Sequence, residues 1–590
     1  MLRILLKVHS LLNSTQRRNA AMLMAFMVIG MVLEIIGVGL VIPVITLMTQ
    51  SDITSRPELR PLLEKIGDPS QVVLIQVAML GLVAIYFTKN IFMAFLAWRQ
   101  TRFAYGLQAE LSQRLFTIYL RQPYTFHLQR NSAQLIRNVT GEVTMFAESV
   151  MNALNVATEL LVLVGIATLL LFFEPVGAVI VVLVLGGAAW MFYRITRSRI
   201  ARWGRARQLH DGLRMQHLQQ GLGGAKDVKL LGREQDFLAR YEVHNVQGAR
   251  VGQFQALVQM LPRLWLEFLG AIGLAILVLT MLANGRAASS ILPTVALFAA
   301  AAFRLMPSVN RVLTAIQMLR YGLPVISTLH EEFGVLAAEP TRASVRGPED
   351  GVRRALEDEI CLVDVSFVYP DAPKPALDRL AIRIRKGETV GFIGPSGSGK
   401  STLVDVILGL LAPTSGQVRV NGRSIQEAMR SWQDQIGYVP QSIYLTDDSL
   451  RRNIAFGLSD AEIDDTAVQK AIRSSQLEEF VGGQPEGIDA VVGERGIRLS
   501  GGQRQRIGIA RALYHDPGIL VLDEATSALD SATERGVMQA VKALHGSKTI
   551  LIVAHRLSTV AHCDRIYRLD HGSIVEEMTS AKMIREASNG

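Results

Sequence analysis

The sequence predicts an all-α membrane domain of six spanning helices, followed by a soluble domain of the α/β class. Three observations support this fold class. Six apolar runs in the first half of the chain are long enough to cross a bilayer. From about Asp364 onward these long runs stop, and the chain reads as a soluble α/β domain. In that half, a short apolar run that reads as a buried strand leads directly into a glycine-rich loop.

Composition is typical of a membrane protein. Of the 590 residues, 49% are hydrophobic and only 19% are charged. The two cysteines, Cys361 and Cys563, have no ligand-spaced partners, which excludes a disulfide framework and argues against a cysteine metal site. The net charge is +9, but the basic residues cluster beside apolar runs, so we expect them to orient the chain in a membrane and expect no nucleic-acid partner.

The apolar runs define the expected spans. They lie at 20–48, 71–98, 150–173, 175–195, 256–283 and 287–318. The third and fourth runs are separated only by Glu174-Pro175, which predicts a tight hairpin at one membrane surface. No cleavable signal peptide is expected, because the apolar run that follows the basic segment 1–19 is too long for one.

The charges of the connecting segments predict the orientation. Arginine and lysine are concentrated at the N-terminus, between spans two and three, and between spans four and five. The opposite side holds the Glu174-Pro175 turn, the 284–286 turn and one longer, charge-balanced loop. By the positive-inside rule, both termini are then cytoplasmic.

The two inner segments are too long for simple turns. We expect them to continue the helices of the flanking spans and to close with short reversals, at Gln122-Pro123-Tyr124 and at 230–234. In the outer loop, the segment 56–67 has leucine and isoleucine at helical spacing. This spacing predicts a short amphipathic helix, which either lies at the outer membrane surface or packs as an ordinary loop helix on the spans.

A phosphate-binding loop follows the apolar strand 390–393. Its residues fit the pattern G-x-x-x-x-G-K-[ST] and are Gly394, Pro395, Ser396, Gly397, Ser398, Gly399, Lys400, Ser401 and Thr402. The glycines let the backbone curl so that its amides face phosphates, and Lys400 adds a positive charge toward the β- and γ-phosphates. Ser401 offers a hydroxyl to a metal ion, and the helix that begins there directs its positive end toward the anion.

A second apolar strand, 519–522, ends in two carboxylates. Asp523 is placed to hold Mg²⁺, directly or through water, and Glu524 is the candidate general base for the attacking water. The alternative is a pair of surface acids at a strand end.

A third motif predicts an anion site at the start of a helix. Ser500 is suited to cap this helix, and the first amides of the helix are then exposed to an anion. The residues of the site are Ser500, Gly501, Gly502 and Gln503.

These motifs, in this order, resemble the nucleotide-binding domain of ABC transporters. The six spans with two long inner extensions resemble the type IV (exporter) fold of that family, so the resemblance covers nearly the whole chain. It implies ATP and Mg²⁺ as cofactors and a fold that joins a six-helix membrane domain to a P-loop ATPase. It also implies that Tyr369 stacks on adenine, that Gln441 reaches the metal ion, that His555 contacts the γ-phosphate and that Asp530 is the acid of the D-loop.

The resemblance further implies a homodimer. In the family, the motif at 500–503 contacts the γ-phosphate held by the glycine loop of the other copy. Because the chain has one copy of each motif and six spans, two copies are needed for two ATP sites and a complete pathway. The inner reversals would be coupling helices, and 492–496 resembles the segment that contacts them, although Ala490 stands where the family usually has threonine.

The expected domains are a membrane domain at 1–335, a linker at 336–357 and a nucleotide-binding domain at 358–590. An unrelated six-helix channel fused to an ATPase is the alternative, which the pattern of the inner segments disfavours.

Ionisable residues within the predicted spans are candidates for contact with cargo. They are Glu34, Lys89, Arg263, Glu267, Arg304 and Arg311. Arg304 and Arg311 share one face of span six, with Glu34 and Glu267 as possible acidic partners on other spans. Arg263 could instead pair with Glu267, four residues away. The basic excess suits an anionic cargo, which predicts the substrate residues Lys89, Arg263, Arg304 and Arg311.

Together with the outer loop and the segment 224–234, this basic excess resembles the lipid-linked oligosaccharide flippases of the PglK type. That resemblance implies flipping of a polyprenyl-pyrophosphate glycan across a bacterial inner membrane. A lipid A or multidrug exporter of the same fold is the alternative. The six spans disfavour an ABC protein that does not transport.

Overall fold

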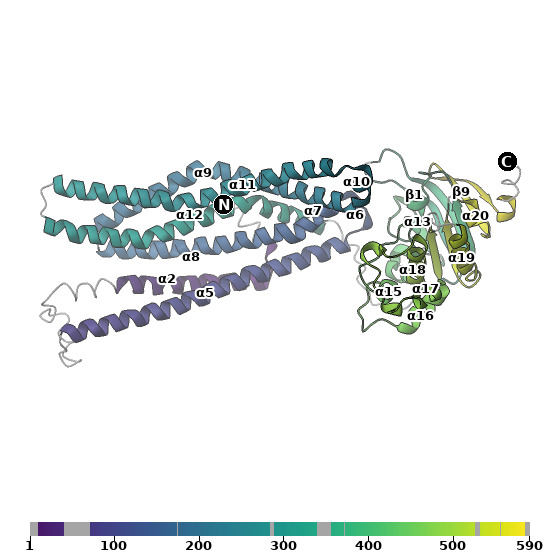
Figure 1. Ribbon diagram of the computed structural model, residues 1–590, viewed down its shortest axis with the longest axis horizontal. Helices are drawn as coiled ribbons and strands as arrows, with labels where there is room; N and C mark the ends of the chain where they lie inside the picture. The colour runs from purple at the N-terminus through teal and green to yellow at the C-terminus, as the bar shows by residue number, and fades with distance from the viewer. Residues whose placement is uncertain are drawn as a thin grey trace. The chain divides into compact units, whose positions relative to one another are not determined.

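A computed structural model describes residues 10–40, 71–173, 175–283, 288–338, 356–370, 372–525, 531–554 and 556–583. The chain divides into two compact units. The first comprises Met1–Gln122 and Gln129–Thr341, and the second comprises Pro123–Leu128 and Arg342–Gly590. The first unit is helical, and the second contains both β-sheets (Figure 1).

Six long helices make up most of the described part of the helical unit (Figure 1). They are α2 (Ser14–Gly39), α5 (Gln71–Arg121), α8 (Val143–Phe173), α9 (Pro175–Gly223), α11 (Glu234–Ala283) and α12 (Ala288–Ala338). Shorter elements are α7 (Ser132–Arg137), the π-helical turn η2 (Asn138–Glu142) and α10 (Ala225–Leu231). The four long helices that flank the two inner segments, α5, α8, α9 and α11, extend beyond their apolar runs, which confirms the predicted helical inner extensions.

Among the described residues, five helical stretches are long and apolar enough to cross a membrane. They are Ser14–Gly39, Val72–Arg121, Ser132–Phe172, Glu234–Thr280 and Leu305–Gly334. The remaining predicted span, 175–195, forms the start of α9, where the structure describes only some of the side chains. The outward side chains of α5 are apolar, with Leu80 and Phe87 each about two-thirds exposed, as a lipid-facing surface requires.

Both predicted reversals are present. Helix α5 ends at Arg121, and the short helix α6 (Tyr124–Gln129) begins after Pro123. Helix α10 ends at Leu231, and the left-handed backbone of Gly232 (φ 60°) turns the chain before α11 begins. The predicted outer helix at 56–67 lies outside the described residues.

Helices α9 and α12 approach each other closely at Gly204. A Cβ atom at this position would lie 2.3 Å from the carbonyl oxygen of Tyr321, so the contact is made backbone to backbone and excludes any side chain. Tyr321, Ile200 and Val251 form a buried apolar cluster next to it, which joins α9, α11 and α12.

The second unit contains two β-sheets. One is antiparallel, with the order β2 (Leu377–Arg385), β1 (Glu359–Phe367), β4 (Ser415–Val420) and β5 (Arg423–Ser424). The other has the order β10 (Ser573–Met578), β9 (Arg565–Asp570), β3 (Thr389–Ile393), β8 (Thr549–Val553), β7 (Ile519–Asp523) and β6 (Ile436–Val439). In this sheet only the edge strand β10 runs antiparallel to its neighbour.

Helices and short helical turns surround these sheets. The α-helices are α13 (Lys400–Ile407), α14 (Met429–Gln433), α15 (Leu450–Ile454), α16 (Asp465–Ser474), α17 (Glu478–Gly482), α18 (Gly501–Leu513), α19 (Ser531–Lys542) and α20 (Leu557–Val560). The 3₁₀ turns are η3 (Ile425–Glu427), η4 (Gly487–Asp489) and η5 (Glu494–Gly496). Helices α15, α16 and α18 enclose an apolar cluster of their own, which includes Leu450, Val468 and Ile507.

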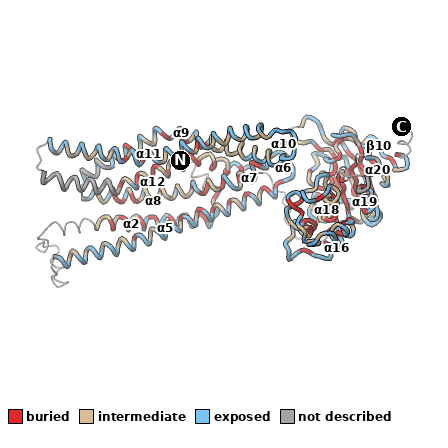
Figure 2. The backbone as a smooth tube through the Cα atoms, viewed as in Figure 1, coloured by how far each residue is buried: buried red, intermediate tan, exposed pale blue. Residues whose placement is uncertain are grey.

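The parallel sheet explains where a site can form. Every residue of β3, β7 and β8 is buried, which confirms the predicted buried strands, and Figure 2 shows buried residues concentrated in this part of the unit. Parallel strands bring their carboxyl ends to one edge of a sheet. The segments that follow β3, β7 and β6 are the glycine loop, Asp523-Glu524 and Gln441, so they meet at that edge.

Candidate nucleotide-binding site

The glycine loop connects β3 to α13, as the sequence predicts. Gly397 and Gly399 have φ values of 79° and 101°, which L-residues with side chains rarely adopt. A Cβ atom at Gly399 would also lie 2.6 Å from the carbonyl oxygen of Ala376. The loop therefore depends on glycine for its curvature, and it ends directly at the N-terminus of α13, where backbone amides can bind an anion.

Lys400 begins α13 and folds back over the loop. Its Nζ donates hydrogen bonds to the carbonyl oxygens of Gly394 and Pro395, each at 3.0 Å, and the residue is almost completely buried. Burial lowers the pKa of Lys400, while the nearby carboxylates of Glu524 and Asp523 act in the opposite direction. The ammonium group thus lies within the loop and close to both acids, where a phosphate could replace the carbonyl contacts.

Asp523 is the last residue of β7 and has one unsatisfied oxygen. Its Oδ2 accepts a hydrogen bond from the Tyr438 hydroxyl at 3.4 Å, whereas its buried Oδ1 has no hydrogen-bond partner among the described residues. Burial and the neighbouring Glu524 raise the pKa of Asp523. A buried carboxylate oxygen without a partner costs free energy, and a cation at Oδ1 would remove that cost.

Glu524 has a strained backbone. Its φ of 48° places it in the left-handed region, which is unfavourable for a residue with a side chain and is often found at functional sites. Its amide donates to the carbonyl oxygen of Val553 at 3.0 Å. Its Oε2 accepts a 2.7 Å hydrogen bond from Nε2 of Gln441. The structure thus brings together the predicted base and the glutamine that is expected to reach the metal ion.

The residues predicted to hold a metal ion fit Mg²⁺ by the chemistry of their donors. Ser401, Gln441 and Asp523 all offer oxygen atoms, which a hard cation prefers. Within the described ranges, no group of three or more His, Cys, Asp or Glu residues could hold a metal ion alone. Mg²⁺ in nucleotide sites is usually held by one or two protein groups together with phosphate and water, so this donor set suits it.

Tyr369 lies beside the phosphate loop. Its hydroxyl forms a 3.1 Å hydrogen bond with Oγ1 of Thr402, and its ring packs edge-on against Phe367 with ring centres 4.9 Å apart. The predicted adenine-stacking residue is thus held against the start of α13.

Ser500 caps helix α18, as the sequence predicts. Its Oγ accepts from the amide of Gln503 at 3.2 Å, and the Gln503 Oε1 accepts from the amide of Ser500 at 2.8 Å. Gly501 and Gly502 form the first turn of the helix. Ser500 itself is exposed, and Gly501, Gly502 and Gln503 are half-buried.

His555 and Asp530 lie outside the described residues. Their roles as γ-phosphate contact and D-loop acid therefore stay predictions.

Sequence reasoning missed two residues at this site, Asp405 and Tyr438. Asp405 lies on α13, and burial together with the charge of Asp523 raises the pKa of its carboxyl to about 6. Tyr438 lies on β6 and bonds Asp523. The spacing of both residues was a usable signal. Asp405 follows Ser401 by one helical turn, which places it on the same face of the helix, and Tyr438 lies three residues before Gln441.

Asp405→Asn should stabilise the nucleotide-free protein at pH 8 and progressively less toward pH 4. The ordinary pKa of an aspartate is 3.8, and the folded protein raises it to about 6. Above pH 6 the Asp405 carboxylate is charged in the folded state, and its burial lowers the free energy of unfolding by roughly 2 kcal/mol. Below pH 4 the carboxyl group is neutral in both the folded and the unfolded state, so this penalty disappears. Thermal unfolding midpoints at several pH values test this. The exposed Asp447→Asn is the control, and a stabilisation that does not vary with pH would rule out the explanation.

Of the ionisable residues singled out in the predicted spans, those whose side chains the structure describes form ion pairs. Nζ of Lys89 lies 2.9 Å from Oε2 of Glu34, and both side chains are almost completely buried between α5 and α2. Nε of Arg263 lies 2.8 Å from Oε1 of Glu267 one turn along α11, which is the pairing alternative.

Arg311 is also paired, with an acid that sequence reasoning missed. Its Nε and Nη2 donate to the two carboxylate oxygens of Glu159 on α8, at 2.5 and 3.1 Å. Glu34 and Glu267, the possible partners that the sequence offered, pair instead with Lys89 and Arg263. Glu159 lies inside the predicted span 150–173, and a complete scan of that span for acids would have found it. The side chain of Arg304 lies outside the described residues.

Comparison with known proteins gives two family matches. Residues 21–305 match the ABC transporter transmembrane region, and residues 377–527 match the ABC transporter family. The structure resembles a bacterial Atm1-family ABC exporter solved with ATP bound, with a TM-score of 0.77, 23% identity, and coverage of 98% of this chain and 97% of that one. At that identity the likeness shows the fold alone.

Curated relatives match over most of their length. A protein of Cupriavidus pinatubonensis is 32% identical over 82% of this chain and 80% of its own. One from Dechloromonas aromatica is 31% identical over 86% of this chain and 85% of its own, and one from Burkholderia orbicola is 30% identical over 89% and 88%. Each is named an ATP-dependent lipid A-core flippase. With both halves matched and an exporter fold, the chain belongs to the ABC transporters, as a type IV exporter half-transporter that couples ATP hydrolysis to transport.

Proposed function

We propose that this protein is a homodimeric ATP-driven flippase that moves a phosphate-bearing lipid of the lipid A-core class across the bacterial inner membrane. The observation that carries the proposal is the shared name of relatives that are 30–32% identical over more than four-fifths of the chain. This finding favours the lipid A alternative over a polyprenyl-pyrophosphate glycan. Flipping of an anionic lipid is common to both.

In this proposal the glycine-loop amides and Lys400 hold the β- and γ-phosphates of ATP. Bound Mg²⁺, held by Ser401, Gln441 and Asp523, would neutralise charge on the phosphates during transfer. Glu524 accepts the proton of the attacking water. Gln441 already donates to Glu524, so one residue links the metal site to the base. Ser500 of the partner subunit would complete each site from the opposite side.

Arg311 remains a candidate cargo contact, in a modified form. Its side chain is 57% exposed although it is paired with Glu159, whereas the Lys89–Glu34 pair is buried. A lipid phosphate could compete with Glu159 for the exposed guanidinium. The carboxylate is planar and the phosphate is tetrahedral, but each can accept two N–H donors from the guanidinium at once. We therefore propose Arg311 and, from the sequence, Arg304 as cargo residues, and assign Lys89 to the packing of α2 on α5.

Transport by purified protein in proteoliposomes tests this proposal. We expect lipid A-core to stimulate ATP hydrolysis and to be flipped, and expect a polyprenyl-pyrophosphate glycan and a cationic drug to have weaker effects. The double variant Arg304→Gln with Arg311→Gln should lose flipping but retain basal hydrolysis. The control Arg197→Gln with Arg199→Gln removes two exposed charges of α9 outside the predicted spans. Stimulation and transport of the drug alone would refute the proposal.

A further inference from the structure

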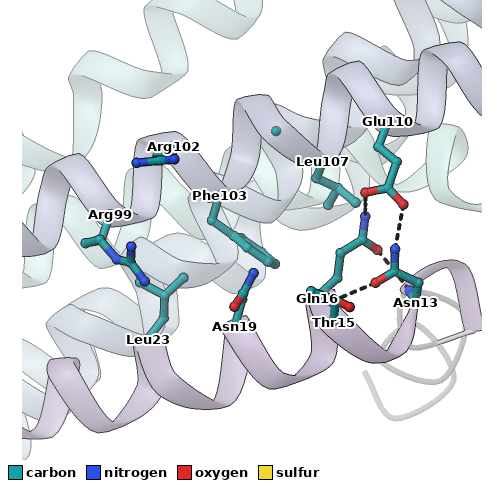
Figure 3. Close-up of a pocket in the computed structure, with 11 residues that line it drawn as sticks. Asn13, Thr15, Gln16, Asn19, Leu23, Arg99, Arg102, Phe103, Leu107 and Glu110 are labelled. Carbon is teal, nitrogen blue, oxygen red and sulfur yellow. Dashed lines mark hydrogen bonds between the residues drawn. The ribbon is translucent and has the colours of Figure 1, made fainter.

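A polar cleft lies between α2 and α5. It has a volume of about 390 Å³, which is within the range of small-molecule sites, ~300–1,000 Å³. Figure 3 shows Arg99 and Arg102 on α5 above Asn19 and Leu23 on α2, with Phe103 between the two helices. The cleft therefore combines cationic and amide groups with an apolar floor, which is the composition that an amphiphilic ligand needs.

The two arginines of the cleft have no acidic partner among the described residues. The closest polar contact of Arg99 is a weak one, from Nη2 to Sδ of Met22 at 4.0 Å, and the Arg102 guanidinium lies 5.4 Å from the ring centre of Trp98. They differ in this from Lys89, Arg263 and Arg311, each of which pairs with a carboxylate. Arg99 and Arg102 are three residues apart on α5 and both line the cleft, so the two positive charges lie on one face of the helix.

The cleft lies at the depth where lipid headgroups are found. The apolar run of α5 ends at residue 98, directly before Arg99, and the apolar run of α2 begins at residue 20, directly after Asn19. Both helices therefore change from polar to apolar at this cleft. Exposed Phe95 and Trp98 continue from it along the apolar part of α5, and tryptophan is typical of the membrane interface.

Glu110 closes the other end of the cleft and does not compete for the arginines. It accepts hydrogen bonds from Nδ2 of Asn13 at 2.5 Å and Nε2 of Gln16 at 2.7 Å, drawn as dashed lines in Figure 3. It follows Arg102 by eight residues, a rise of about 12 Å along the helix. A headgroup at the arginines therefore meets two positive charges and no nearby negative charge.

We propose that this cleft binds the phosphate headgroup of an anionic phospholipid of the inner leaflet, with its acyl chains along Phe95 and Trp98. The site is separate from the charged residues of α8, α11 and α12, and the proposal does not depend on the identity of the cargo.

Binding of tail-labelled phosphatidylglycerol to the purified full-length protein in detergent tests the proposal. Arg99→Gln with Arg102→Gln removes the phosphate donors and should weaken binding at least ~10-fold. Gly106→Phe fills the cleft and should weaken binding similarly while both arginines remain. Gly106 lines the cleft, and a Cβ atom there meets no atom within 4 Å, so a side chain can begin at this position without a backbone clash.

Two matched controls isolate the site. Arg197→Gln with Arg199→Gln removes the same charge from exposed positions at the inner end of the α9 span, and Gly81→Phe makes the same change at an open position of α5. Both should bind the lipid within ~2-fold of the unmodified protein. Gel filtration and the thermal midpoint report folding, and if Gly106→Phe does not fold, the arginine variant decides.

Several outcomes would overturn the proposal. One is that Arg99→Gln with Arg102→Gln binds phosphatidylglycerol as tightly as the unmodified protein does. A second is that the α9 control loses as much affinity as that variant. A third is that the unmodified protein binds phosphatidylcholine as tightly as phosphatidylglycerol. Competition by glycerol 3-phosphate at the concentration of the lipid would assign the site to a soluble phosphate instead.

Discussion

Glu524→Gln is expected to slow ATP hydrolysis by ~10²–10⁴-fold while leaving ATP binding intact. The carboxylate is the only group lost, because glutamine has the same shape and its amide oxygen can still accept the hydrogen bond from Gln441. The protein should therefore bind ATP and accumulate in a closed, ATP-loaded dimer.

Steady-state hydrolysis and the retention of labelled ATP measure these two effects separately. Glu479→Gln, a change of the same kind at an exposed position of α17, is the control and should hydrolyse ATP normally. Turnover by Glu524→Gln close to that of the control would remove Glu524 from the role of base.

Mixed dimers of Lys400→Ala and Ser500→Arg should retain one ATP site of two. Lys400→Ala removes a charged phosphate donor, a loss of about 1.5–3 kcal/mol, or roughly 10–150-fold in affinity. Ser500→Arg places a bulky side chain at the exposed cap of α18. If each site combines the glycine loop of one subunit with Ser500 of the partner subunit, one site of the mixed dimer carries both changes and the other carries neither.

Differently tagged subunits, purified through both tags, allow the bound ATP per dimer to be counted. The unmodified dimer should occlude two ATP molecules, the mixed dimer one, and each singly substituted homodimer none. Complete loss in the mixed dimer would mean that each site is built within one subunit, and would contradict the composite arrangement.

The positions of the glycine loop and the two acids could be predicted from the sequence, because these residues lie at the ends of buried strands. The glycine loop follows β3, and Asp523-Glu524 follows β7, so a parallel sheet was enough to bring them to one edge. The hydrogen bond between Gln441 and Glu524 could not be predicted in this way, because it depends on β6 lying next to β7. Nor does any sequence pattern indicate the left-handed backbone of Glu524.

The helical unit was predicted less completely. Apolar runs locate spans, and Gly232 marks a reversal, because both features are local. The pairing of Arg311 with Glu159 depends on how α12 and α8 rotate and pack against each other, which hydropathy does not determine. For the same reason hydropathy does not predict that Lys89 pairs with Glu34 on a different helix.

The buried Lys89–Glu34 pair has a consequence for biogenesis. During synthesis α2 leaves the ribosome before α5, and at that stage Glu34 has no ammonium group to neutralise it. On insertion scales, moving a lone charged residue near the centre of a segment into the membrane costs about 2.5–3.5 kcal/mol. Each helix would meet this cost separately if the two entered the lipid one at a time. Entering as a preformed hairpin, they carry a neutral pair. The translocon should therefore hold α2 at its lateral gate until α5 arrives, and release the two helices together.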